Sequence, residues 1–192
     1  MGTAVGSALL VMDVQQGTVE RYGDEALLDR LAQAVAAARA AEIPVVHVRV
    51  AFRPGFPEVS PNNRTFSQLA ATAGDAYGED SPRTRIHPAV APVPGEPVVV
   101  KKRISAFVGS DLEVVLRSLG VSRLVLTGIA TSGVVLSTLR EAADRDFQLT
   151  VLADACADGD AEVHRVLTEK VFPRQADVVP VAVWADGLKG DR

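Results

Sequence analysis

Two oppositely charged side chains, each directly after a short apolar run, are the residues best suited to chemistry. Asp13 follows the run ALLVM, and Lys101 follows VVV with Lys102 and Arg103 behind it. A lysine beside a carboxylate favours its ionised form, and a carboxyl group so placed can move protons in a reaction. Taken singly, Asp13 also fits a turn cap or the partner of a surface lysine, and the cations also fit a solvated loop.

A third segment, LVLTGIATSGVV, passes from an apolar run into a helix start that contains Thr131, Ser132 and Gly133. The free backbone amides of a helix start can bind negative charge. The simpler interpretation is a strand-to-helix corner, with Thr131 or Ser132 as the cap and Gly133 chosen for close packing.

Short apolar runs alternate with helical patterns, an order that favours a parallel sheet covered on both faces. The predicted strands are Ala8 to Val14, Pro44 to Ala51, Pro97 to Lys102, Arg123 to Ile129, Gln148 to Asp154 and Asp177 to Val183. The predicted helices are Asp24 to Glu42, Ser110 to Leu119, Gly133 to Asp146 and Asp160 to Phe172. Open α/β sheets bind ligands at the carboxyl ends of their strands, so the three segments are expected to meet at one edge.

The 192 residues are predicted to form a single domain, residues 1–192, with one long excursion at residues 53–94 over the mouth of the pocket. This stretch holds seven prolines, and only Asn63 to Ala73 has a helical pattern inside it. Loops of this length are usually functional or disordered, and here the position next to the predicted site favours a covering role.

Together the three segments resemble the isochorismatase-like superfamily, also called the cysteine hydrolase family, from Ala8 to about Val183. Its D-x-Q motif matches Asp13-Val14-Gln15, and its lysine matches Lys101 ahead of Ser105-Ala106-Phe107, with Lys102 as an uninvolved neighbour. Its G-x-x-T-x-x-C-V motif, followed by S/A-T, is matched by Gly128, Thr131, Val134, Val135, Ser137 and Thr138. The resemblance implies a three-layer αβα Rossmann-like fold around a six-stranded parallel sheet.

The sequence departs from the family at its nucleophile, because Val134 stands where the cysteine is expected. Members with the cysteine hydrolyse amides through a thioester, whereas the true isochorismatases lack it and cleave a vinyl ether with the aspartate as proton donor. The resemblance therefore implies Asp13 and Lys101 as catalytic residues and the backbone amides of Ala130 and Val134 as an oxyanion hole. It also implies a cis peptide at Ile129-Ala130. A hydroxyl of Thr131, Ser132 or Ser137 in place of the thiol is the less favoured alternative.

Other residues near these motifs are predicted to line the pocket: Gln15, Arg49, Phe52, Phe107, Ile129, Thr131 and Ser132. For Arg49 a solvated surface position is an equal alternative, and Phe107 also fits the core. The single cysteine, Cys156, follows the next predicted strand and matches a structural position of the family.

No cofactor or metal is expected, because the spacing of the three histidines supplies no converging set of ligands. A net charge of -4 with mixed signs argues against nucleic acid and membrane partners, and one cysteine fits a reducing, cytoplasmic location. The expected partners are a small-molecule substrate and further copies of the chain, in a homodimer or larger homo-oligomer, as is common in the family.

The leading hypothesis is a hydrolase that acts on a small organic molecule by a mechanism independent of thiol, with vinyl-ether-type cleavage included. The alternative is a small-molecule-binding or regulatory homologue that kept the fold and lost catalysis. A resemblance limited to the fold would transfer no function.

Overall fold

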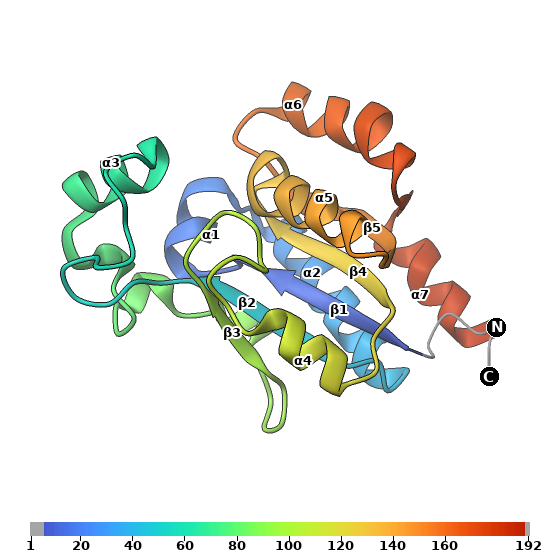
Figure 1. The fold of residues 1–192 in the computed structure, drawn as a ribbon. Helices are drawn as coiled ribbons and strands as arrows, with labels where there is room; N and C mark the ends of the chain where they lie inside the picture. Colours follow the sequence, from blue (N-terminus) through green and yellow to red (C-terminus); the bar gives the residue numbers. More distant parts are fainter. Residues whose placement is uncertain (1–5, 191–192) are drawn as a thin grey trace.

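A parallel sheet of six strands forms the centre of the computed structural model, which describes residues 6–190 (Figure 1). The order across the sheet is β3-β2-β1-β4-β5-β6, and each neighbouring pair is parallel. The strands are β1 (Ser7–Met12), β2 (Val45–Val50), β3 (Val98–Lys101), β4 (Arg123–Ile129), β5 (Gln148–Ala157) and β6 (Asp177–Val179). The predicted fold class is confirmed.

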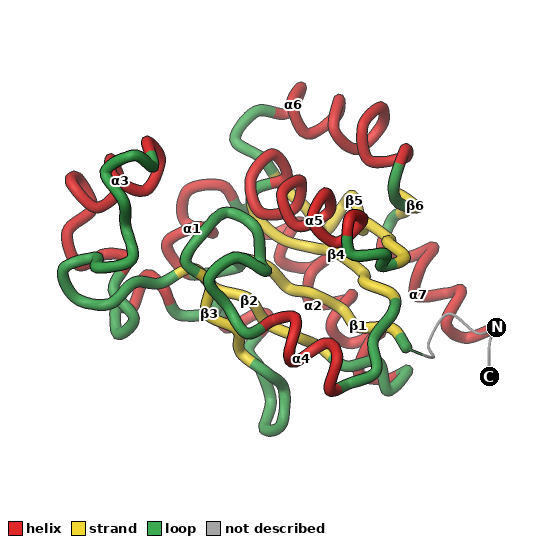
Figure 2. The backbone as a smooth tube through the Cα atoms, in the orientation of Figure 1, coloured by secondary structure: helices red, strands yellow, loops and turns green. Residues whose placement is uncertain are grey.

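Helices cover both faces of this sheet, as Figures 1 and 2 show. One face carries α4 (Leu112–Ser118), α5 (Leu136–Asp144) and α6 (Ala161–Val166), and the other carries α1 (Gln16–Tyr22), α2 (Glu25–Ala40) and α7 (Val181–Gly190). Successive residues of a strand point to opposite faces, so Leu10 and Met12 pack on the α5 side while Leu9 and Val11 pack on the α2 side. This explains why β1 is apolar at almost every position and buried throughout.

The helix α2 begins where the sequence predicted. The side chain of Asp24 accepts a hydrogen bond from the backbone N–H of Leu27 at 2.7 Å, which satisfies one free amide of the first turn. Leu27 and Leu31 are buried against the sheet from the predicted apolar face. The cap and the apolar stripe together fix this helix on the β1 side of the molecule.

The excursion between β2 and β3 contains α3 (Arg64–Ala73) and three short turns, η1 (Gly74–Tyr77), η2 (Pro82–Thr84) and η3 (Pro88–Val90). In Figure 2 α3 stands apart from the sheet. Its Phe66 packs instead on the ring of Phe52, which also contacts the ring of Phe56, in a separate aromatic cluster just beyond β2. The excursion therefore has a small core of its own.

Three predictions of secondary structure were wrong in detail. The strand predicted to reach Val183 ends at Val179, because Pro180 has no N–H for a sheet and the following residues form α7 instead. Cys156, expected after a strand, lies inside β5, which runs on to Ala157. The helix α1 was not predicted, since Val19 is its only buried residue and it has no apolar stripe.

The strand order reverses next to β1, which has β2 on one side and β4 on the other. In open α/β sheets such a switch point is the usual ligand site, at the carboxyl ends of the strands. The residues that follow β1 and β4 are Asp13 and the 130–135 turn. Within residues 6–190, no helix is both long and apolar enough to cross a membrane.

Candidate functional site

Asp13 follows β1 directly and lies at the switch point. Its φ of 54° is in the left-handed region, which aspartate enters more readily than most residues. Its backbone N–H still donates to the carbonyl of Val48 at 2.8 Å, so the residue is tied to β2 while its chain direction changes. The residue is 8% exposed. A nearly buried carboxyl group thus lies at the carboxyl ends of the central strands.

Lys101 ends β3 and contacts this carboxyl group. Its Nζ lies 2.8 Å from Oδ2 of Asp13, and it also donates to the carbonyl oxygens of Arg103 at 2.9 Å and Ile104 at 3.0 Å. An ammonium group has three N–H donors, so these contacts use all of them. Lys102 contacts the carbonyl of Ala51 and the carboxylate of Glu79 instead. Of the two adjacent lysines, Lys101 is the one at Asp13.

The environment of Asp13 favours proton transfer. Burial raises the pKa of this carboxyl above its usual value, and the ammonium of Lys101 acts in the opposite direction. Its second oxygen, Oδ1, is buried and has no hydrogen-bond partner among the described residues. A carboxyl group with a raised pKa and one unused oxygen can exchange a proton with a bound molecule.

Beyond β4 the chain comes unusually close to β1. A Cβ on Gly128, where φ is +135°, would lie 2.1 Å from the carbonyl oxygen of Met12, so only glycine fits there. The peptide bond between Ile129 and Ala130 is cis. This close approach brings the turn after β4 next to the residue that precedes Asp13.

The turn itself is η4 (Thr131–Val135), a wide helical turn with a non-helical residue at Gly133. The carbonyl oxygen of Ala130 accepts hydrogen bonds from the amides of Gly133 and Val135. Val134 is 2% exposed and belongs to the apolar cluster on the α5 side, together with Met12 and Phe107. Position 134 therefore belongs to the core on the α5 side and carries no polar group.

The profile of the isochorismatase domain family matches residues 7–183, a range that includes all of these segments. The chain belongs to the isochorismatase family. Its curated relatives include "Ureidoacrylate amidohydrolase RutB" of Methylobacterium radiotolerans, which is 35% identical over 202 residues, with 94% of this chain and 78% of that protein covered. They also include "Uncharacterized isochorismatase family protein YecD" of Escherichia coli O157:H7, 30% identical, with 90% of each chain covered.

Among solved structures, a cysteine hydrolase from Pseudomonas syringae pv. phaseolicola superposes with a TM-score of 0.90 over 99% of this chain and 95% of that one. Its sequence identity is 21%, so this likeness shows the fold alone. The fold described here is thus that of the isochorismatase family.

Three residues that were predicted to line the pocket of this isochorismatase-family chain hold the excursion in place. Both polar atoms of the Gln15 amide bond backbone, with Nε2 donating to the carbonyls of Val50 and Thr84 and Oε1 accepting the amide of Val50. Arg49 donates to the carbonyls of Glu79 and Thr84 at 3.2 and 3.3 Å. Phe52 is fully buried in the aromatic cluster. That these three residues line the pocket stays a prediction. The contacts they make in the structure hold the backbone and the aromatic cluster in place.

The other predicted lining residues lie on the turns after β3 and β4. Phe107 is 7% exposed, and Ile129 is buried at the end of β4. Thr131 is buried with Oγ1 2.8 Å from Nδ1 of His164, and the amide of Ser132 donates to Asp158 at 2.6 Å. No sequence pattern indicated His164 or Asp158 as a partner of this turn, because both contacts join segments more than 25 residues apart.

The histidines lie at separate places. His47 contacts Glu96, His87 accepts the amide of Ala89, and His164 contacts Thr131. In the part of the chain that the structure describes, no group of three or more His, Cys, Asp or Glu side chains is arranged to hold a metal ion.

Proposed function

We propose that this protein is a hydrolase that adds water to a small organic substrate by acid–base catalysis at Asp13, without a thiol nucleophile. The observation that carries the proposal is the buried Asp13 carboxyl group, paired with Lys101 through Oδ2 and unpartnered among the described residues at Oδ1. A structural ion pair alone does not require a raised pKa together with an unused buried oxygen at a strand end. Both features suit a group that transfers protons.

The proposed chemistry uses one water molecule. Asp13 takes a proton as the water oxygen bonds to the electrophilic carbon of the substrate, and it returns that proton to the leaving nitrogen or oxygen as the second bond breaks. Asp13 ends the cycle in its starting state. Lys101 has no donor left for the substrate, so its role is to hold the carboxyl group. The amides of Ala130 and Val134 are the proposed donors to negative charge on the substrate.

A thiol mechanism is disfavoured by both positions that could supply one. Val134 has no nucleophilic atom. Cys156 lies inside β5, is 5% exposed, and has its pKa raised to about 12 by burial, so it holds no thiolate at neutral pH. Water is therefore the proposed nucleophile.

Two substrate classes deserve a direct test. Ureido and carbamoyl amides are suggested by the relative named as a ureidoacrylate amidohydrolase. Vinyl ethers are suggested by the sequence resemblance to isochorismatases without the cysteine. The mechanism above applies to the amides. A vinyl ether needs the reverse order, because its carbon becomes electrophilic only after protonation: the protonated Asp13 gives its proton to the terminal vinyl carbon, and water then adds to the resulting oxocarbenium carbon as Asp13 takes a proton from that water. The hemiketal so formed breaks at the ether oxygen, which leaves as the alcohol with the hemiketal hydroxyl proton.

The deciding experiment is a mass-spectrometric screen of small amides, ureido acids, vinyl ethers and lactones against the wild type, Asp13→Asn and Cys156→Ala. The expected result is a substrate that is turned over by the wild type and by Cys156→Ala, with iodoacetamide having no effect, and that Asp13→Asn leaves at least about 100-fold less reactive. Equal turnover by Asp13→Asn would refute the mechanism. A compound that binds and is recovered unchanged would favour a non-catalytic binding protein instead.

A further inference from the structure

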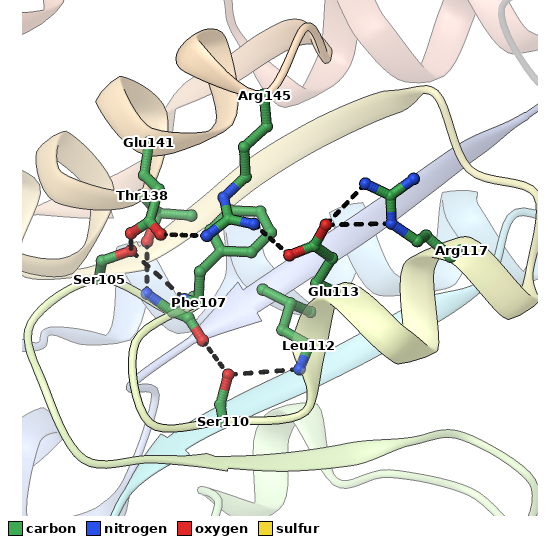
Figure 3. Close-up of polar contacts among 10 residues, drawn as sticks. Ser105, Phe107, Ser110, Leu112, Glu113, Arg117, Thr138, Glu141 and Arg145 are labelled. Carbon is green, nitrogen blue, oxygen red and sulfur yellow. Dashed lines mark hydrogen bonds and ion pairs between the residues drawn. The ribbon is translucent and has the colours of Figure 1, made fainter.

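The loop between β3 and α4 is bonded to α5 by two consecutive residues, as Figure 3 shows. The hydroxyl of Ser105 donates to Oε2 of Glu141 at 2.5 Å. The next residue, Ala106, donates its backbone N–H to the Thr138 hydroxyl at 2.9 Å. Ser105 and Ala106 are buried, so these bonds are protected from competing water. They fix the loop to one helix at two adjoining points.

The same loop holds Lys101 from its other side. The two carbonyl oxygens that accept from the ammonium belong to Arg103 and Ile104, immediately ahead of the residues bonded to α5. Four consecutive residues therefore link the lysine to the helix. A displacement of Ser105 would move the carbonyls that set the position of Nζ against Asp13.

Glu141 is itself held in place by Arg145, one turn further along α5. Nη2 of Arg145 donates to Oε1 of Glu141 at 2.7 Å, while the guanidinium lies 4.8 Å from the centre of the Phe107 ring. The Glu141 side chain is 24% exposed and that of Arg145 is 33% exposed, so both are partly shielded. Each carboxylate oxygen of Glu141 thus has a different partner, one on the helix and one on the loop (Figure 3).

A purely stabilising role for these charges is the alternative, since ion pairs between helices are common on protein surfaces. Glu113 of α4 provides the comparison inside the molecule. It pairs with Arg145 and with Arg117, as Figure 3 shows. Glu113 therefore shares the charge network with Glu141 but not the bond to Ser105.

The geometry points to Glu141 as a positioning residue, which acts through Ser105 to hold the 103–106 backbone and thereby the ammonium of Lys101 against Asp13. The inference deepens the proposed function, on which it rests for the role of Asp13. Because α5 continues directly from η4, the same helix would align the Asp13–Lys101 pair with the turn that carries Ala130 and Val134.

The test is a pH titration of the Asp13 carboxyl group, monitored by NMR. The protein is labelled with ¹³C at its aspartate carboxyl groups, and the Asp13 signal is identified as the one that is missing in Asp13→Asn. We expect Ser105→Ala and Glu141→Ala to raise the midpoint by roughly 0.5 to 1 pH unit, because a lysine held less firmly stabilises the ionised carboxyl less. Glu113→Ala should leave the midpoint unchanged. Glu141→Gln, which keeps an oxygen for Ser105, should stay near the wild type.

Thermal unfolding of the same variants separates positioning from stability. The inference is wrong if Ser105→Ala and Glu141→Ala leave the Asp13 midpoint at its wild-type value, or if Glu113→Ala moves it as far for a similar loss of thermal stability. A shift in Glu141→Gln as large as in Glu141→Ala would show that an oxygen acceptor for Ser105 is not what holds the midpoint, and it would also overturn the inference. The titration needs no substrate, so it can succeed or fail whether or not the screen finds turnover.

Discussion

Lys101 and Asp13 contact each other across the end of β2, a strand that contains neither residue. Lys101 ends β3 and Asp13 follows β1, and β2 lies between these strands in the sheet. Neighbouring strands are about 4.8 Å apart, so the two backbones are separated by roughly 10 Å. The 2.8 Å contact between Nζ and Oδ2 is made by the long lysine side chain reaching over the end of β2. The pair therefore depends on the length of that side chain as well as on its charge.

Replacement of Lys101 by Met should leave Asp13 buried without its cation. The pKa of Asp13, already raised by burial, should then rise further, because the ammonium is the main group that opposes this effect, ahead of the backbone of Val50. A carboxyl group protonated at neutral pH cannot take a proton from water, so kcat/KM should fall by at least about 100-fold near pH 7. The acidic limb of the pH–rate profile should move to higher pH in any residual activity.

Lys102→Met is the matched control for that variant, because Lys102 bonds Ala51 and Glu79 and not Asp13. It should keep the wild-type pH profile. Circular dichroism at the assay temperature would show that both variants are folded. If Lys101→Met retained the wild-type rate and profile, the lysine would have no part in holding Asp13.

Val134→Cys should restore a nucleophile if position 134 is the one the family motif indicates. The change is made in a Cys156→Ala background, so that the chain has one thiol. We expect hydrolysis of a small amide that iodoacetamide abolishes, because a thiol next to an acid–base group can attack a carbonyl carbon. Amide hydrolysis by the variant would be followed by mass spectrometry.

Val134→Ala in the same background is the control for the loss of the branched side chain. Alanine leaves similar space but supplies no thiol, so any increase in amide hydrolysis should be insensitive to iodoacetamide. A Val134→Cys protein that is folded and alkylated without any inhibitable activity would count against this position as the vacant nucleophile site.

The parts of the site that follow from strand ends could be predicted from the sequence. Asp13 and Lys101 each follow an apolar run, and parallel strands bring their carboxyl ends to one edge. Contacts set by tertiary packing could not be found in this way. Thr131 meets His164 from a helix 33 residues later, and Glu141 meets Ser105 from 36 residues away, with no periodicity to link either pair. The apolar residues after Pro180 fit a strand as well as a helix until packing decides.

Gln15→Leu should destabilise the protein through the excursion. The Gln15 amide bonds the backbone of Val50 on both its N–H and its C=O and the carbonyl of Thr84, all within a buried region. Leucine is similar in size and leaves the N–H and C=O of Val50 without this partner, while the Thr84 carbonyl keeps its contact with Arg49. An unsatisfied buried group costs about 1–3 kcal/mol, so we expect a loss of about 2–4 kcal/mol in the free energy of unfolding.

Urea unfolding would measure this loss, with Gln68→Leu on the exposed side of α3 as the control. That substitution alters a glutamine of the same excursion and should change the free energy of unfolding by less than about 0.5 kcal/mol. A Gln15→Leu protein as stable as the control would mean that the three bonds contribute nothing net.

The pair of His47 and Glu96 should give the protein a pH dependence that is separate from the candidate site. His47 is fully buried, with Nε2 3.1 Å from Oε2 of Glu96, which also binds Arg39. Burial lowers the pKa of His47 below its usual 6.5, whereas hydrogen bonds from Arg39 lower the pKa of Glu96 to about 2. In both cases the unfolded chain binds a proton at a higher pH than the folded protein does.

Stability should therefore fall in two steps as the pH is lowered. The first begins near 6.5, where unfolded His47 takes up a proton, and the second lies between about 4.5 and 2, where unfolded Glu96 does so. Each proton contributes at most about 1.4 kcal/mol per pH unit. His47→Gln should remove the first step, as read from urea unfolding between pH 7.5 and 5. An unchanged slope in His47→Gln would mean that His47 is not its source.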